Sequence, residues 1–139
     1  MTYLGVDYGL ARIGLAISES GVLSKPICII QNKGDKKNIV AIKEVITKYC
    51  GSMSDIPLCI VVGLPLYKDG NESEMSCEAR KFGELLARDL VSMVEYQNEY
   101  LSSSTATDIM RGKKGDKSID AVAAAVILQN YLDNNGGKQ

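Results

Sequence analysis

Residues 58–64 read Leu-Cys-Ile-Val-Val-Gly-Leu, a continuous apolar run. A strand with one face in water alternates apolar and polar residues, whereas a strand covered on both faces is apolar throughout. The run is therefore typical of a buried parallel strand in an α/β sheet. The segments around it support this interpretation, because each side carries a helix pattern.

Helices are expected before and after this strand. Asn38 is a candidate N-cap for a helix that runs to about Tyr49, in which isoleucine and valine recur at helical spacing. Residues 65–73 are rich in Gly, Asn and Asp and predict a loop. Residues 74–90 are rich in strong helix formers and predict a long second helix.

The remaining segments complete a mixed sheet. Short strand patterns joined by short loops predict an antiparallel meander at the N-terminus, and a further strand pattern follows the second helix. Ser102 to Met110 is expected to be helical, and Ser118 is a candidate cap for a last helix to about Leu132. We expect one α/β domain over residues 1–139, a five-stranded mixed sheet with helices on both faces. The strand segments are 3–7, 12–17, 26–31, 58–64 and 92–98.

Composition limits the chemistry. The 139-residue chain has a net charge of −1 and no histidine, which excludes Ser-His-Asp and Cys-His mechanisms. Its four cysteines are scattered, so a structural zinc site is not favoured. No signal peptide or apolar run of membrane-spanning length is evident, so we expect a cytoplasmic protein without a membrane partner.

Three acidic residues are the candidate catalytic and metal-binding residues. Asp7 ends the first strand, Glu99 follows the last one, and Asp120 lies in the first turn of the last helix. Each has an ordinary explanation by itself: a turn residue, a solvated glutamate and a helix-dipole acid. Together they form the set of oxygen ligands that Mg²⁺ or Mn²⁺ requires, and two such ions hydrolyse phosphodiesters without histidine.

Asp120 is the most informative of the three acids. On a helical wheel it falls within a predicted apolar face that is expected to pack on the sheet, and a carboxylate there needs a partner. For the residue alone, the dipole explanation is favoured over a metal by roughly two to one. The predicted face consists of Ile119, Val122, Ala123, Val126, Ile127 and Tyr131.

Basic residues are available for a phosphate backbone, although charged runs are usually solvated loops. The basic segment 111–117 precedes Asp120, and the loop after residue 64 also reaches outward. The candidate substrate-binding residues are Arg12, Lys68, Arg111, Lys113, Lys114 and Lys117.

Four blocks in order resemble the YqgF-type proteins, described as Holliday junction resolvases or pre-16S rRNA nucleases of the ribonuclease-H-like superfamily. The resemblance covers nearly the whole chain. The blocks are Leu4–Gly9 with Arg12–Ala16, Val61–Leu66 with Asp69-Gly70, Glu99 with Leu101–Ser103, and Lys117 with Asp120-Ala121 through Leu132.

The resemblance implies a ribonuclease-H-like fold, nuclease activity and acidic residues at Asp7, Glu99 and Asp120. The chain departs from the family pattern in one block. Asn98-Glu99-Tyr100 stands where the family usually has Asp-Glu-Arg, so a carboxylate and a guanidinium are replaced beside Glu99.

Other functions share parts of this pattern. An actin-like or sugar-kinase-like nucleotide binder has a similar opening strand, but it needs two lobes and this chain supplies one. A non-catalytic nucleic-acid-binding module would explain Asn98 and Tyr100. Within the nuclease interpretation, the substrate is pre-16S rRNA, which we favour, or branched DNA in recombination. A junction resolvase should be a homodimer, whereas RNA trimming is possible for a monomer.

Overall fold

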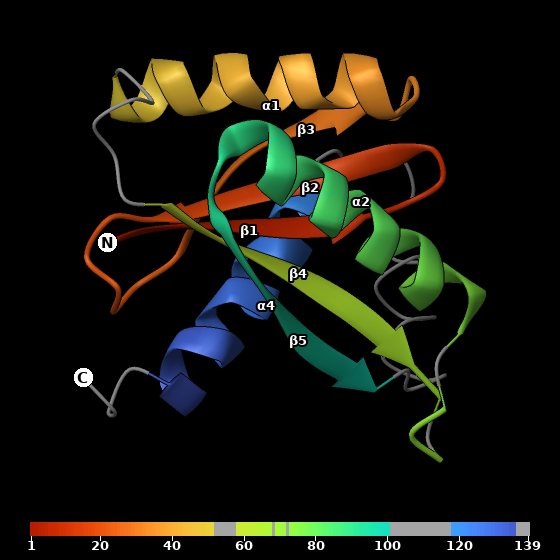
Figure 1. The fold of residues 1–139 in the computed structure, drawn as a ribbon. Helices are drawn as coiled ribbons and strands as arrows, with labels where there is room; N and C mark the ends of the chain where they lie inside the picture. Colours follow the sequence, from red (N-terminus) through yellow and green to blue (C-terminus); the bar gives the residue numbers. More distant parts are fainter. Residues whose placement is uncertain (52–57, 68, 72, 101–117, 136–139) are drawn as a thin grey trace.

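The computed structural model describes residues 1–51, 58–67, 69–71, 73–100 and 118–135, and the predicted helix 102–110 lies outside them. The predicted fold class is confirmed: a five-stranded mixed sheet lies between helices (Figure 1). The strands are β1 (Thr2–Tyr8), β2 (Arg12–Ser18), β3 (Lys25–Gln31), β4 (Leu58–Leu66) and β5 (Met93–Tyr100). The helices are α1 (Asp35–Cys50), α2 (Glu74–Leu90) and α4 (Ser118–Asn135).

The strand order is β3-β2-β1-β4-β5. Short turns make β1, β2 and β3 an antiparallel meander, as predicted. β4 pairs in parallel with β1 on one side and with β5 on the other. Parallel neighbours need a crossover connection, and α1 and α2 supply one each. β4 therefore lies inside the sheet, which explains its continuous apolar sequence.

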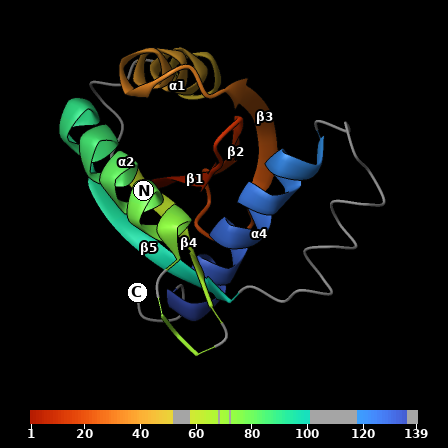
Figure 2. The ribbon, with the colours of Figure 1, turned by 90° about the vertical axis from the view of Figure 1, so that its right-hand side faces the viewer.

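Two apolar cores hold the helices on opposite faces of the sheet, and Figure 2 shows the resulting three layers. The larger core packs α1 and α2 on one face and is built from Leu, Ile and Val with Phe82 at its centre. The smaller core lies under α4. Its buried members are Tyr3, Ala16, Cys59, Val61, Ala124, Ile127, Leu128 and Leu132.

α4 approaches the sheet at two glycines. A Cβ on Gly5 would lie 2.8 Å from the Leu128 Cβ and 2.9 Å from the Ala124 carbonyl oxygen. A Cβ on Gly63 would lie 2.5 Å from the end of the Ile127 side chain. A side chain at Gly5 would push the helix away from the sheet, whereas one at Gly63 would first displace the end of the Ile127 side chain.

Two local predictions are wrong. α1 begins at Asp35 with Gly34 as its N-cap, so Asn38 is a buried residue within the helix and not its cap. Val122 and Val126 of α4 are about half exposed, although they were placed on the predicted core face. The predicted Ile127 is buried, but the rest of the buried stripe is Ala121, Ala124, Leu128 and Leu132, because this side of the helix faces Gly5 of β1.

Within the described residues, no helix has the length and apolar character needed to cross a membrane.

The glycine contacts predict unequal effects of two matched substitutions. Gly5→Ala should lower the free energy of unfolding by about 1–3 kcal/mol, the usual cost of overpacking, because its new methyl group meets a backbone carbonyl. Gly63→Ala should cost less, since the end of Ile127 can rotate away. Urea denaturation of both variants measures the difference, and equal losses would contradict this account of the α4 contact.

Candidate active site

Asp7 lies at the carboxyl end of central strand β1, on the face that α4 covers. It is opposite Gly14 of β2 in the sheet register. Side chains alternate along a strand, so Asp7 shares its face with Tyr3 and Gly5, both of which contact α4. The candidate carboxylate is therefore on the same side of the sheet as the last helix, as the proposed site requires.

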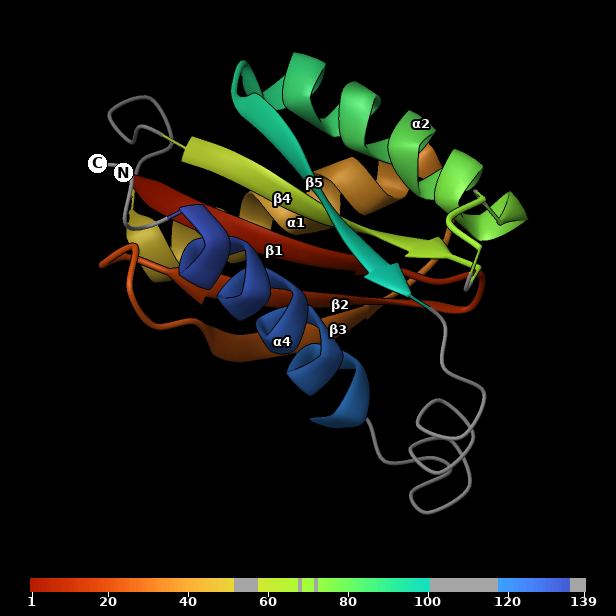
Figure 3. The same ribbon diagram turned by 90° about the horizontal axis from the view of Figure 1, so that it is seen from below.

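The contacts along β1 bring Asp7 toward the start of α4. Tyr3 stacks on Tyr131, with ring centroids 6.1 Å apart, and Gly5 contacts Ala124 one turn or more earlier in the helix. Residues further along β1 therefore contact positions nearer the amino end of α4. Asp7 is the next step, and Asp120 lies one turn before Ala124. Figure 3 shows the first turn of α4 on the side to which the strands β1, β4 and β5 point.

Glu99 lies inside β5, opposite Pro65 of β4, and not beyond the strand as predicted. Its carboxylate Oε1 accepts a hydrogen bond of 3.2 Å from the Nδ2 of Asn130 in α4. Burial raises the pKa of Glu99, and the Asn130 hydrogen bond lowers it by a smaller amount. Glu99 is therefore a partly desolvated carboxylate whose described partner is a neutral amide.

The three acids are not equally close in backbone position. Asp7 and Glu99 are separated by β4, which places them about 10 Å apart across the sheet at ordinary strand spacing. Asn130 follows Asp120 by ten residues, or about 15 Å along a helix. The contacts of Tyr3 and Gly5 direct the carboxyl end of β1 toward the start of α4, whereas the Glu99 carboxylate lies against a later turn of that helix.

A hydrogen-bonded turn follows Asp7. Asn32 donates from Nδ2 to the Gly9 carbonyl (2.7 Å) and from its backbone N–H to the Ala11 carbonyl (3.0 Å). The Nδ2 of Asn38 in turn donates to the Asn32 Oδ1 (2.9 Å). The sequence interpretation did not identify these two asparagines as site-supporting residues. The sequence feature that could have identified them is Asn38, a polar residue beside the apolar positions of α1.

The glycine in this turn is also required by space. A Cβ on Gly9 would lie 2.6 Å from the Arg12 carbonyl oxygen, which is backbone and cannot rotate away. The turn therefore closes tightly between Asp7 and Arg12. Asn32, which follows β3, fixes the two carbonyl oxygens of this turn by hydrogen bonds.

The candidate substrate-binding residues are mostly outside the described part of the chain. Arg12 begins β2, directly after the turn that follows Asp7. Asn98 is an exposed residue of β5, and Tyr100 is the last residue of that strand. Lys68, Arg111, Lys113, Lys114 and Lys117 lie outside the described residues.

The donor chemistry of the site fits a hard divalent cation. Asp7 and Glu99 offer carboxylate oxygens on the α4 face, which Mg²⁺ and Mn²⁺ prefer. A desolvated carboxylate such as Glu99 also gains from a nearby cation. Among the side chains that the structure describes, no three acidic or cysteine residues are already gathered around one point. Asp120 is not in that set, since only its backbone position is described.

The sheet order, the three layers and an aspartate on the central strand beside the last helix define a ribonuclease-H-like α/β protein. The sequence matches the RuvX family, described as Holliday junction resolvase, over residues 1–134. The chain belongs to this family, which the sequence resemblance predicted under the name YqgF.

Relatives of similar length support the family assignment. A protein of Paraburkholderia xenovorans is 34% identical over 134 residues, covering 95% of this chain and 88% of the relative. One from Caldanaerobacter subterraneus subsp. tengcongensis is 35% identical over 142 residues, covering 96% and 97%. One from Hydrogenovibrio crunogenus is 36% identical over 131 residues, covering 94% and 92%. All three are named "Putative pre-16S rRNA nuclease".

Solved structures share the fold. RuvC of Thermus thermophilus superposes with a TM-score of 0.53 at 15% identity, covering 99% of this chain and 97% of that one. The same protein in complex with a Holliday junction substrate gives a TM-score of 0.55 at 15% identity, covering 99% and 96%. At this identity the likeness confirms the ribonuclease-H-like architecture alone.

The environment of Glu99 predicts a pH-dependent stability. Its folded-state pKa is raised, so Glu99 destabilises the fold progressively as the pH rises above its unfolded value of about 4.3 through the folded value. Glu99→Gln removes this cost and keeps an oxygen for Asn130. In chelator, the stability gain of the variant should be small near pH 4 and larger near pH 7. Thermal unfolding across this range tests the sign; a gain that shrinks with pH would contradict it.

Proposed function

We propose that this protein is a metal-dependent nuclease that hydrolyses phosphodiester bonds of structured nucleic acid. The observation that supports the proposal is the position of Asp7, at the carboxyl end of the central strand of a RuvX-family fold and on the face that α4 covers. We expect Asp120, in the first turn of α4, to lie near Asp7 at the carboxyl edge of the parallel strands, where α/β proteins bind their substrates.

Asp7, Glu99 and Asp120 are the proposed ligands of Mg²⁺ or Mn²⁺, with two ions as the expected number. Such ions, when bound, activate the attacking water and stabilise the leaving oxygen. The protein contributes position and charge: Asp7 is fixed by the pairing of β1 with β2 and by the tight turn after it. To bind a metal ion, Glu99 would have to give up its hydrogen bond from the Asn130 amide, which now holds its carboxylate.

Basic residues are proposed to hold the phosphate backbone. Arg12 is near Asp7 through the short β1–β2 turn. The other candidates are Lys68, Arg111, Lys113, Lys114 and Lys117. The net charge of −1 is low for a nucleic-acid-binding protein, so affinity should come from local groups and weaken with salt.

For the substrate, we favour the 5′ region of pre-16S rRNA, as the names of the relatives suggest. The family description supports a branched DNA substrate as the second candidate. A non-catalytic binding module remains the alternative of another class, and Asn98 and Tyr100 are the residues that favour it. A monomer suits the RNA substrate, and a homodimer suits the DNA junction.

Removal of a proposed ligand should abolish cleavage without unfolding the protein. Loss of even an outer-shell group costs about 10–100-fold at metal sites, so Asp7→Asn and Asp120→Asn should each lose more than about 100-fold. Asp89→Asn, an exposed aspartate of α2, is the matched control and should retain activity. Rates measured with Mg²⁺, Mn²⁺ or chelator complete the test. Cleavage unchanged in Asp7→Asn would refute the site.

The substrate is decided by offering a labelled four-way DNA junction and a 5′-extended 16S precursor RNA to the same preparations. Metal-dependent cleavage of one substrate, lost in Asp7→Asn, assigns the function. A folded protein that binds either substrate and cuts neither would instead support the binding module.

A further inference from the structure

Three lysines gather where β3 passes into α1. Lys33, Lys36 and Lys37 are all exposed, and the one acidic residue within this segment is Asp35. Among the described residues, none of the three ammonium groups forms an ion pair. We call these residues the α1 lysine patch. It was not among the substrate-binding residues predicted from the sequence.

The fold does not gain stability from this placement. The first turn of a helix carries a partial positive charge, which disfavours cations and favours acids. Lys36 and Lys37 lie in that turn, and Lys33 adds a like charge directly before the N-cap Gly34. With no ion pair to these lysines in the described part of the chain, three cations around the positive end of α1 are electrostatically unfavourable, and a polyanion would relieve the repulsion.

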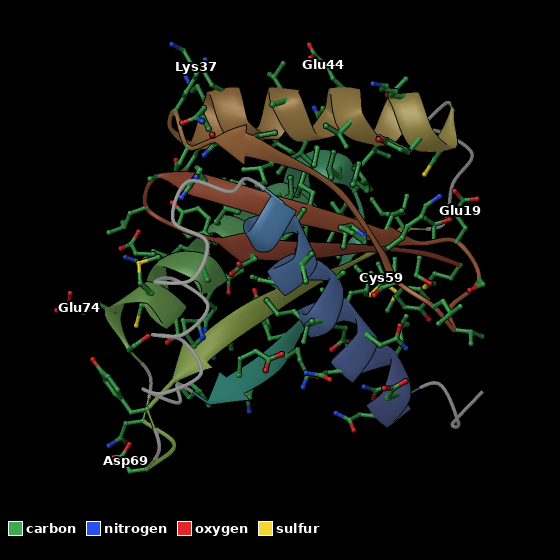
Figure 4. All side chains as sticks on the ribbon, turned by 180° about the vertical axis from the view of Figure 1, so that it is seen from behind. Glu19, Lys37, Glu44, Cys59, Asp69 and Glu74 are labelled. Atoms are coloured by element: carbon green, nitrogen blue, oxygen red, sulfur yellow. The ribbon has the colours of Figure 1, made fainter. Side chains whose placement is uncertain are left out.

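The patch is tied to the turn that follows Asp7. Lys33 donates its backbone N–H to the Asn38 Oδ1 (2.9 Å), and Asn38 bonds Asn32, which holds the carbonyls of Gly9 and Ala11. The lysines are therefore at a fixed distance from the candidate active site. In Figure 4, Lys37 lies at the end of the molecule that also carries Glu74 and Asp69, whereas Glu19 lies at the opposite end.

We propose that the α1 lysine patch binds the phosphate backbone of the nucleic-acid strand whose bond is cut at Asp7. The inference rests on the proposed nuclease function and extends the binding surface to the opposite side of the β1–β2 turn from α4. Lysine suits this role, because it neutralises phosphates as a point charge without reading sequence. The same chemistry serves RNA and DNA, so the patch adds affinity and orientation to either.

Two triple variants, one in the patch and one as a matched control, test this proposal. The patch variant is Lys33→Gln/Lys36→Gln/Lys37→Gln, and the matched control is Lys48→Gln/Lys81→Gln/Arg88→Gln. Both remove three charges. The control residues are favourably placed for stability: Lys48 and Arg88 lie in the last turns of α1 and α2, and Lys81 is 3.9 Å from Glu78. Both triples are made in the Asp7→Asn background, so that binding is measured without cleavage.

The expected results have opposite signs for binding and stability. The patch variant should bind the junction DNA or the precursor RNA about 10-fold more weakly at about 0.1 M salt, and its salt slope should fall by about three. Its Tm without nucleic acid should be equal to or above that of the parent. The control variant should keep nearly the parent affinity and have a lower Tm.

Each other outcome overturns the proposal. Unchanged affinity and salt slope in the patch variant would show that the lysines do not touch the substrate. Equal weakening in both triples would show a general effect of net charge. A Tm loss in the patch variant equal to that of the control would show that the lysines serve the fold. If the Asp7→Asn parent itself binds neither substrate, the proposed function fails, which is distinct from failure of the patch alone.

Discussion

The close approach of α4 to the sheet is the constraint on which the site depends. Gly5 lets the backbone of α4 approach β1, and Gly63 lets the Ile127 side chain of α4 lie on the backbone of β4. The contact fixes both the height of α4 above the sheet and its register along β1. Because Asp7 is two residues beyond Gly5, and Asp120 is one turn before Ala124, we expect the same contact to set the separation of the two aspartates.

The apolar cores on the two faces of the sheet differ in size and in composition. The larger core under α1 and α2 buries long aliphatic chains around Phe82 and supplies most of the apolar burial. The core under α4 is smaller and built on alanine and glycine contacts, with Cys59 and Tyr131 near its far end. Tight packing that buries little apolar area adds little stability, but it fixes the distance between α4 and the sheet. That suits the face that carries the acids.

The sequence predicted the sheet, its layers and the family, because these follow from patterns that extend over whole elements. The continuous apolar run of β4 indicated a buried parallel strand, and the short turns of the first three strands indicated an antiparallel meander. Together they predicted a mixed sheet. Local features were predicted less well. Asn38 resembles an N-cap, yet α1 starts at Gly34, since the Asn38 side chain bonds Lys33 and Asn32 and so stabilises an earlier start. Val122 and Val126 mark an apolar face by composition, whereas the small residues of α4 decide which face fits the sheet.

The sequence predicts candidate site residues but not how their side chains are arranged. Asp7 and Asp120 follow from strand and helix ends, whereas the partner of Glu99 depends on how α4 crosses β5, which no local pattern encodes. The sequence also gave no reason to connect α1 with Asp7, because the connection runs through two asparagine side chains and a turn carbonyl. Stability and activity then make opposite demands on charge. A desolvated Glu99 and three lysines around the start of α1 both weaken the isolated fold, and the proposed cation and polyanion would offset these two costs.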